Sequence, residues 1–237
     1  MSKIRAVIFD CYSTLIDIKT NEHKDEIFYY LSMFLEYYGL SLTPEQLRTS
    51  IEQEKKRIVK QKKERYPEVD LELVFRAILR KEGSDDHHVA ESCCKLLRVF
   101  SIDQLQLFPD SVPVLRQMKD SGYPLAIVSD AQKAFCIDEI KSLGIAHFFD
   151  HFVISSSFGF AKPDLRLFAI ACSLLGIEPY ETAYIGDNPV KDVKGPKKIG
   201  IRSILLNRSN ETLRTDVEPD FIASDLWEAW RWIKENS

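Results

Sequence analysis

Short apolar runs recur along the chain, and a helix-like segment follows most of them. The runs are rich in β-branched residues, which predicts buried strands, and they span residues 4–9, 123–128, 152–154, 182–185, 202–206 and 221–222. The helix-like segments each end at a glycine and span residues 111–121, 134–143, 165–175 and 191–199. This alternation is typical of a parallel sheet with crossover helices on both faces. We therefore expect an α/β fold with a Rossmann-like, doubly wound parallel sheet.

The stretch from about residue 20 to residue 100 has a different pattern, without a clear strand. Helical periodicity runs through residues 26–38, 71–79 and 89–99. Thr43 followed by Pro44 is typical of a helix start with threonine as the N-cap. These features predict an all-helical insertion of about four helices after the first strand. The expected domains are a core of residues 1–17 and 101–237 and a helical cap of residues 18–100.

Composition and charge narrow the class of protein. Hydrophobic residues make up 45% of the 237 residues and charged residues 29%, with a formal net charge of −4. That sign argues against a nucleic-acid binder held by bulk charge, because such domains are usually basic. No stretch approaches the roughly 20 apolar residues of a membrane helix, and the first apolar run is too short for a signal peptide. We expect a cytoplasmic monomer or homodimer that binds neither nucleic acid nor membranes.

Two further features favour structural rather than functional interpretations. The five cysteines are odd in number and include no C-x-x-C pair, so we expect reduced thiols rather than a disulfide framework or a zinc site. Residues 55–65 are strongly basic. They could form a surface for an anionic ligand or partner, but the solvated face of a long helix is the simpler interpretation.

Four short segments at or near predicted strand ends carry the candidate chemistry. They are FDCYSTLID (residues 9–17), IVSD (127–130), FAKPD (160–164) and YIGDNPVKD (184–192). In open parallel sheets, ligands bind beyond the carboxyl ends of the strands, where Asp10, Ser129 and Asp187 stand. Each segment alone is weak evidence, but all four in this order are hard to attribute to chance.

The residue types in these segments suggest a reaction. The carboxylate of Asp10 could attack an electrophilic phosphorus or carbon and form an ester intermediate. Asp187 and Asp192 could hold Mg²⁺ through hard oxygen ligands, and the metal would offset repulsion between an anionic nucleophile and an anionic substrate. Lys162 could keep Asp10 ionised, and the hydroxyl of Ser129 could bind phosphoryl oxygens.

With these segments in place, the chain resembles the haloacid dehalogenase superfamily, in the branch with a helical cap inserted after the first strand. The resemblance covers nearly the whole length and implies a hydrolase that acts through an aspartyl-enzyme intermediate. It implies catalytic roles for Asp10 as nucleophile, Ser129 as phosphate-binding hydroxyl and Lys162 as stabilising lysine. The implied Mg²⁺ ligands are Asp10, the backbone carbonyl of Tyr12, Asp187 and Asp192. Thr14 matches the threonine that steadies the loop after the nucleophile, and the implied phosphate-binding set is Thr14, Ser129, Asp130 and Lys162.

The first segment departs from the phosphatase pattern at Tyr12. Phosphatases of this family usually have a second aspartate there, which protonates the leaving group and then activates water. A phenol with an ordinary pKa near 10 is a poor substitute at neutral pH, and general acid–base catalysis typically contributes roughly 10²–10⁴-fold. Ser13 also replaces a usual glycine, and Asp130 a commoner asparagine.

A tyrosine at position 12 resembles the 2-haloacid dehalogenases, which need neither an acid nor a metal. That branch typically has Ser-Asn where this chain has Gly186-Asp187, and it places an arginine early in the cap. No arginine occurs between Asp17 and Arg48. The first segment therefore favours a dehalogenase, whereas the fourth segment and the cap favour a phosphatase.

Three hypotheses remain open from the sequence. The first is a Mg²⁺-dependent phosphatase acting on a small phosphorylated metabolite. The second is a 2-haloacid dehalogenase acting on a halogenated acid, and the third is a non-catalytic binding or regulatory protein on the same fold. All three predict that Asp10, Ser129, Lys162 and Asp187 converge at one pocket under the helical cap.

Overall fold

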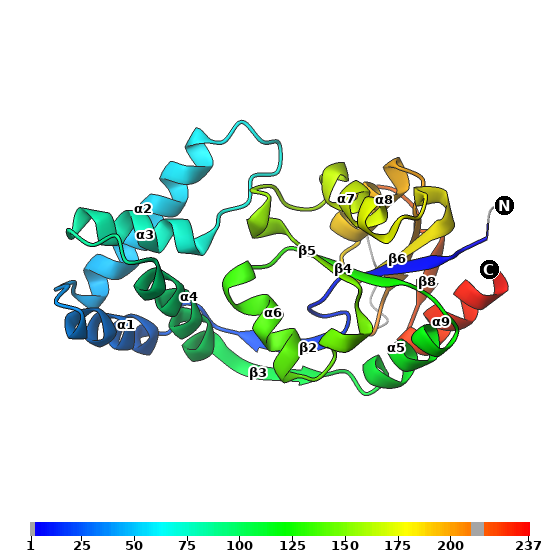
Figure 1. Cartoon of the computed structure of the whole chain (residues 1–237), viewed down its shortest axis with the longest axis horizontal. Coiled ribbons are helices and arrows are strands. Elements are labelled where there is room, and N and C mark those ends of the chain that lie inside the picture. The colour runs from blue at the N-terminus through cyan, green and yellow to red at the C-terminus, as the bar shows by residue number, and fades with distance from the viewer. Residues whose placement is uncertain (1–2, 210–215) are drawn as a thin grey trace.

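The computed structural model describes residues 3–209 and 216–237, and its main sheet has six strands (Figure 1). The strands are β1 (Ala6–Phe9), β4 (Leu125–Ser129), β5 (His151–Ile154), β6 (Thr182–Gly186), β7 (Arg202–Leu206) and β8 (Phe221–Ala223). All neighbouring strands are parallel, in the order β5-β4-β1-β6-β7-β8. Each predicted apolar run therefore forms a strand, with its ends within about two residues of the prediction.

Alternate residues of the strands face opposite sides of the sheet, and each side has its own hydrophobic cluster. In β1, Val7 and Phe9 belong to one cluster and Ile8 to the other. The first cluster also contains apolar side chains of α5 (Ser111–Asp120), α6 (Lys133–Ser142) and α9 (Leu226–Glu235). The second contains those of α7 (Leu165–Leu175), against which α8 (Lys191–Lys198) packs. Helices thus cover both faces, and the predicted doubly wound α/β fold is confirmed.

Two features of the fold are absent from the sequence-based prediction. The last helix, α9, has apolar residues at helical spacing and buries Leu226, Ala229, Trp230 and Ile233. Strands β2 (Ile16–Thr20) and β3 (Ile102–Leu107) pair as an antiparallel ribbon. The ribbon brings together two segments about 85 residues apart, so neither strand has its partner nearby in the sequence.

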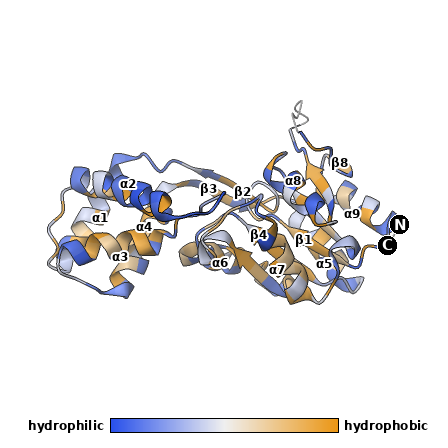
Figure 2. Cartoon of the chain, turned by 90° about the horizontal axis from the view of Figure 1, so that it is seen from above, coloured by the Kyte–Doolittle hydropathy of each residue, from blue (hydrophilic) through white to orange (hydrophobic). Residues whose placement is uncertain are grey.

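Four helices form a bundle at the far end of this ribbon, here called the four-helix unit (Figures 1 and 2). They are α1 (Asp25–Tyr37), α2 (Pro44–Gln61), α3 (Leu71–Lys81) and α4 (His87–Ser101). The unit has a hydrophobic cluster of its own, distinct from those of the sheet. Thr43 caps α2 in a reciprocal capping box with Gln46, and Pro44 is the first helical residue, as predicted.

The connection between α2 and α3 contacts the sheet domain directly. The amide of Glu68 donates to the carbonyl of Gly159 at 3.0 Å, and the amide of Ala161 donates to the carbonyl of Tyr66 at 2.8 Å. Pro67 and Phe160 form an isolated antiparallel bridge between these hydrogen bonds. The four-helix unit is therefore anchored next to the loop that carries Lys162.

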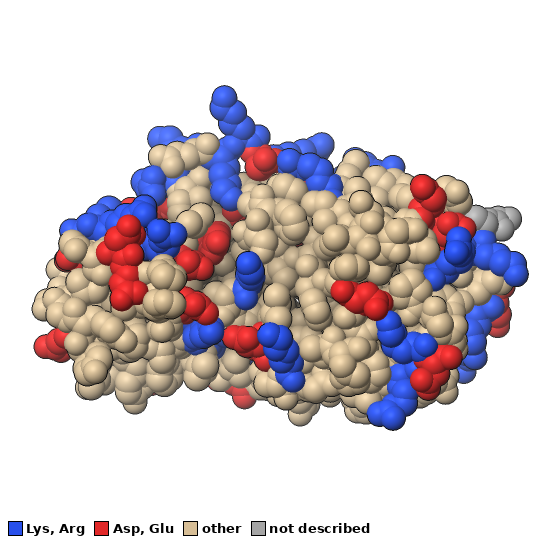
Figure 3. Space-filling model, viewed as in Figure 1, with Lys and Arg blue, Asp and Glu red and all other residues tan. Residues whose placement is uncertain are grey.

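The surface and the cysteines agree with the structural interpretations of the composition. All five cysteines are buried and free. Lys56 and Lys60 of α2 are exposed, and Figure 3 shows Lys and Arg side chains gathered over α2, as expected for a solvated helix face. The helix ends at Gln61, so residues 62–65 of the basic stretch lie beyond that face. Within the described ranges, no helix combines the length and apolarity needed to cross a bilayer.

Candidate active site

Three of the predicted residues stand where neighbouring strands end. Asp10 directly follows β1, which lies between β4 and β6 in the sheet, and its amide donates to the carbonyl of Ile185 at 2.8 Å. Ser129 is the last residue of β4 and is 1% exposed. Asp187 follows β6 directly. Since β1, β4 and β6 are parallel neighbours, their carboxyl ends share one edge of the sheet.

Lys162 joins this edge from the loop before α7. Its ammonium nitrogen lies 3.0 Å from Oδ1 of Asp10 and 2.7 Å from Oδ1 of Asp192, and the residue is 3% exposed. Burial opposes the charged form of the lysine, but the carboxylates of Asp10, Asp192 and Asp130 outweigh burial and raise its pKa. Lys162 is therefore a fixed cation beside the predicted nucleophile.

Three carboxylates gather around this cation. Asp10, Asp187 and Asp192 each offer an oxygen, and these oxygens lie within 4.8 Å of one another. Burial raises the pKa of Asp10 to about 7 against the opposing effect of Lys162, and the charges of Asp192 and Asp187 add to the increase. Burial also raises the pKa of Asp187, and the charge of Asp192 reinforces it. The cluster therefore holds more negative charge than Lys162 alone balances.

This donor set fits a divalent cation such as Mg²⁺, which prefers carboxylate oxygens. Oδ1 of Asp10 is a buried oxygen that accepts no hydrogen bond from the described residues, although the ammonium of Lys162 lies at ion-pair distance. Asp192 differs, because Oδ1 accepts from Lys162 at 2.7 Å and Oδ2 from the amide of Asn188 at 2.9 Å. Asp10 and Asp187 are therefore better placed as direct ligands, and Asp192 fixes Lys162.

The loop after Asp10 is supported from two sides. The hydroxyl of Thr14 donates to Oδ1 of Asp187 at 3.3 Å, and Arg208 donates to the carbonyl of Thr14 at 3.0 Å while pairing with Asp110. Ser13 has a φ of 60°, which explains why glycine is usual there, since a left-handed backbone costs an L-residue roughly 1–2 kcal/mol. The contacts of Thr14 suit a residue that steadies this loop, and its contact with phosphate stays a prediction.

Asp130 holds the lysine loop through two protein partners. Its Oδ1 accepts from the backbone amide of Lys162 at 2.8 Å, and its Oδ2 lies 2.9 Å from the ammonium of Lys191. Both oxygens thus face protein donors. A carboxylate would also repel the anionic phosphate that Asp130 is predicted to bind. The structure gives Asp130 a role in positioning Lys162, while its predicted contact with phosphate remains untested.

Tyr12 makes side-chain contacts that the sequence did not predict. Its hydroxyl donates to Oε2 of Glu139 on α6 at 2.6 Å, and Arg98 of α4 binds the same carboxylate. Burial raises the pKa of the Tyr12 phenol above its ordinary value, and nearby thiols and Glu139 add to the increase. The tyrosine therefore holds its proton more tightly than a free phenol does, so it is a poorer acid. The predicted role of its backbone carbonyl as a metal ligand stays a prediction.

Tyr184 is a further member of the site. It lies within β6, and its hydroxyl is 3.0 Å from Nζ of Lys162 and 3.1 Å from both Oδ1 of Asp192 and the carbonyl of Val128. A hydroxyl inside a fully buried strand requires hydrogen-bond partners. That requirement, together with the position three residues before Asp187, is the signal in the sequence that indicates a role for this tyrosine.

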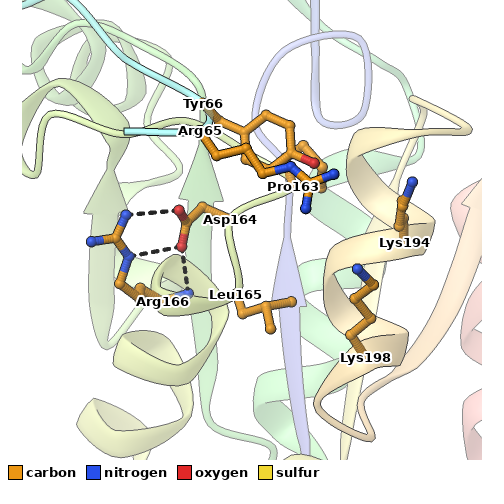
Figure 4. A pocket seen from close by; sticks show the side chains of 8 residues that line it. All are labelled: Arg65, Tyr66, Pro163, Asp164, Leu165, Arg166, Lys194 and Lys198. Atoms are coloured by element: carbon orange, nitrogen blue, oxygen red, sulfur yellow. Dashed lines mark hydrogen bonds and ion pairs between the residues drawn. The ribbon is translucent and has the colours of Figure 1, made fainter. Parts of the chain in front are cut away.

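A pocket of about 290 Å³ lies between α7, α8 and the α2–α3 connection (Figure 4). Its lining residues are Arg65, Tyr66, Pro163, Asp164, Leu165, Arg166, Lys194 and Lys198. Arg166 is paired with Asp164 at 2.8 Å within it. The lining contains neither Asp10 nor Asp187, so we assign the candidate chemistry to the strand ends.

Comparisons with known proteins agree with the geometry. Residues 4–200 match the family model described as haloacid dehalogenase-like hydrolase. The chain is 30% identical over 159 residues to phosphoserine phosphatase of Thermus thermophilus, an alignment covering 67% of this chain and 63% of that protein. It is 30% identical over 152 residues to glyceraldehyde 3-phosphate phosphatase of Methanopyrus kandleri, covering 62% and 65%. The matches thus span just under two thirds of these two phosphatases.

Other matches cover the full length at lower identity. The chain is 23% identical to (S)-2-haloacid dehalogenase 4A of Burkholderia cepacia, over 100% of this chain and 97% of that protein. The solved structure of a 2-haloacid dehalogenase from Pseudomonas syringae has a TM-score of 0.73 at 20% identity, with 99% of each chain covered. A phosphatase structure from Thermococcus onnurineus has a TM-score of 0.60 at 22% identity and the same coverage. With a family match over most of its length and this fold, the chain belongs to the haloacid dehalogenase-like hydrolases.

Proposed function

We propose that the chain is a Mg²⁺-dependent phosphatase that acts on a small phosphorylated metabolite through an aspartyl-phosphate intermediate. The observation that carries the proposal is the carboxylate cluster of Asp10, Asp187 and Asp192, with oxygens within 4.8 Å of one another and Lys162 3.0 Å from Asp10. A dehalogenase that uses no metal has no need of this surplus of buried negative charge. The names of the two phosphatases with 30% identity point in the same direction.

The residues of the chain supply the nucleophile and its charge balance. Lys162 favours the ionised form of Asp10, which is the nucleophilic form. Ser129 stands at the end of the adjacent strand, where its hydroxyl can donate to a phosphoryl oxygen. Asp10 and Asp187 would hold Mg²⁺, which supplies positive charge against the substrate phosphate when bound.

The reaction has two steps that conserve atoms and charge. In the first, a carboxylate oxygen of Asp10 forms a bond to phosphorus while the bond from phosphorus to the leaving oxygen breaks. In the second, water attacks the phosphorus of the acyl phosphate, the bond to Asp10 breaks, and inorganic phosphate leaves. The carboxylate of Asp10 is thereby regenerated.

Tyr12 restricts which leaving groups depart readily. Its hydroxyl is committed to Glu139 at 2.6 Å, and its raised pKa makes it a weak acid. A leaving group that requires protonation would lose the roughly 10²–10⁴-fold benefit of an acid catalyst. We therefore propose acyl or aryl phosphates, whose leaving groups are stable as anions, as the preferred substrate class.

Phosphate release tests this proposal. We expect turnover of acetyl phosphate and p-nitrophenyl phosphate with Mg²⁺, and slower turnover of alkyl phosphates such as glycerol phosphate. Asp10→Asn should reduce kcat by at least about 10³-fold, because it removes the nucleophile. Asp17→Asn is the matched control, since Asp17 hydrogen-bonds to Gln106 within the ribbon at 3.1 Å. Absence of turnover of both acetyl phosphate and p-nitrophenyl phosphate, together with absence of Mg²⁺ binding, would exclude the phosphatase.

A second candidate function is supported by Tyr12 and by the full-length match to (S)-2-haloacid dehalogenase 4A. Halide release from 2-chloropropionate in the presence of a metal chelator would favour it over the phosphatase. Arg98 of the four-helix unit contacts the ring of Tyr12, but it is already paired with Glu139 at 2.6 Å. Because that ion pair occupies the guanidinium of Arg98, this arginine is poorly placed to bind the carboxylate of a halogenated acid.

We also propose that the four-helix unit serves as a cap over the site, with residues 18–100 as the cap domain and residues 1–17 and 101–237 as the core. Support comes from the hydrogen bonds between residues 66–68 and 159–161, which adjoin Lys162. Side chains of the cap would then select the substrate, and exclusion of water would protect the acyl phosphate.

A further inference from the structure

Tyr12 belongs to a buried ion pair between two helices. Its hydroxyl donates to Oε2 of Glu139 on α6 at 2.6 Å. Arg98 on α4 donates to the same carboxylate, from Nε to Oε1 at 2.6 Å and from Nη2 to Oε2 at 3.1 Å. Arg98 and Glu139 are 8% and 7% exposed. The ion pair of Arg98 and Glu139 therefore joins the four-helix unit to the sheet domain, and Tyr12 shares its carboxylate.

Stability alone is a weak explanation for this arrangement. Replacing a buried ion pair by apolar residues is often neutral or stabilising, because the charges lose their hydration. What a two-point contact between guanidinium and carboxylate supplies is a defined geometry. The guanidinium carbon of Arg98 also lies 5.1 Å from the ring centroid of Tyr12 and 4.7 Å from that of Phe135. Tyr12 is thus held at its hydroxyl and at its ring.

The backbone of Tyr12 is part of the loop that follows the nucleophile. Within that loop, the amides of Leu15 and Ile16 donate to the carbonyl of Cys11 at 2.9 and 3.0 Å. A shift of α4 against α6 would move Glu139, and through it Tyr12, two residues from Asp10. We propose that Tyr12 is a positioning residue through which Arg98 and Glu139 tie the backbone beside Asp10 to the placement of the four-helix unit. The proposal rests on the proposed function for the nucleophilic role of Asp10.

The same two helices carry a natural control. Lys95 on α4 pairs with Asp138 on α6 at 3.2 Å, and their side chains are 44% and 60% exposed. This pair also bridges the four-helix unit and the sheet domain, but it is solvated. Asp138→Asn therefore tests the general effect of losing a charge between α4 and α6, without changing a contact of Tyr12.

Steady-state kinetics with p-nitrophenyl phosphate test the role of Tyr12. Tyr12→Phe should lower kcat about tenfold or more with KM within about twofold, because misplacement beside the reacting group slows the chemical step. Glu139→Gln should lower kcat to a similar extent. The double variant Tyr12→Phe/Glu139→Gln should lose little more kcat than either single variant, since the effects of residues that act as a unit are not additive. Asp138→Asn should leave both constants within about twofold. Unchanged kcat in Tyr12→Phe, multiplicative losses in the double variant, or an equal loss in Asp138→Asn would each overturn the proposal.

Amide hydrogen exchange tests the same connection without turnover. Arg98→Met combined with Glu139→Gln removes both charges together and so leaves no buried charge unpaired. Faster exchange at Leu15 and Ile16 than in wild type and in Asp138→Asn is expected, and unchanged exchange there would refute the connection. Should the combined variant fail to fold, Tyr12→Phe provides the same comparison. A wild type that releases no phosphate would refute the proposed function, while the exchange data would still decide the positioning role.

Discussion

Lys162 and the carboxylates around it illustrate how burial sets the chemistry of single residues. The ammonium lies 3.0 Å from Asp10 and 2.7 Å from Asp192, and all three residues are buried. One cation between two carboxylates, with Asp187 nearby, leaves the cluster negative, and burial raises the pKa of Asp10 to about 7. Burying this uncompensated negative charge lowers the free energy of unfolding, as is common where an active site requires reactive groups.

The raised pKa of Asp10 predicts how the stability of the metal-free protein depends on pH. In the unfolded chain this carboxyl titrates near its ordinary value of 3.8, whereas the folded value is about 7. Between these values the folded protein binds a proton that the unfolded chain has lost, so raising the pH lowers the free energy of unfolding. Thermal unfolding with a chelator should therefore show the advantage of Asp10→Asn over wild type growing from pH 4.5 to pH 7.5.

The comparison with Asp10→Asn cancels the other titrating groups to first order, because both proteins retain them. A difference between the two melting temperatures that stays constant across this pH range would contradict the assignment. A pKa of Asp10 that folding lowers would also give a constant difference in this range, because its effect would fall below the unfolded value of 3.8.

At the scale of elements, the contact of α8 with α7 brings Asp192 to Lys162. A Cβ at Gly195 of α8 would lie 2.3 Å from the ring of Phe168 on α7 and 3.1 Å from the carbonyl of Pro163. Glycine therefore allows α8 to approach both α7 and the loop that carries Lys162. The position of one lysine thus depends on the packing of two helices.

Gly195→Ala should destabilise the protein by about 1–3 kcal/mol, because overpacking forces Phe168 or the helix to move. Alanine favours a helix by up to about 1 kcal/mol over glycine, which offsets only part of this effect. Lys194→Ala, on the neighbouring half-buried position, should change the free energy of unfolding by less than about 0.5 kcal/mol. Urea unfolding of both variants measures the difference, and an equally stable or more stable Gly195→Ala would refute the packing argument.

At the scale of the whole molecule, the described residues join the four-helix unit to the sheet domain at several places, and three of these connections bear on the site. They are the β2–β3 ribbon, the hydrogen bonds between residues 66–68 and 159–161, and the contact of α4 with α6. The last two meet the sheet domain close to Lys162 and Tyr12. Whatever stabilises the strand-end cluster should therefore stabilise the molecule as a whole.

Mg²⁺ should raise the free energy of unfolding if Asp10 and Asp187 bind it. At a free Mg²⁺ concentration 100 times the dissociation constant, the gain in free energy of unfolding is about 2.7 kcal/mol. The gain should be larger above pH 7 than below, because protons compete with the cation for Asp10. Asp187→Asn should abolish most of the gain, and Asp17→Asn should retain it. Thermal shift measurements with and without Mg²⁺ test this, and an equal gain in Asp187→Asn would place the cation elsewhere.

The sequence by itself determines the strands of the main sheet and its crossover helices, because the period of apolar residues and the glycine stops are local properties of the chain. It also determines that Asp10, Ser129 and Asp187 share one edge, since the carboxyl ends of parallel neighbours coincide. The capping box of Thr43 belongs to the same class, because its partner Gln46 is three residues away.

Only the tertiary structure decides the partners of these residues. The ribbon joins segments from opposite ends of the helical insertion. Tyr12 meets Glu139 across a separation of 127 residues, and Arg98 meets Glu139 across 41. The raised pKa of Asp10 likewise arises from burial and from the charges of Asp192 and Asp187. Such effects depend on distances through space and on the removal of water, which no local pattern of residues encodes.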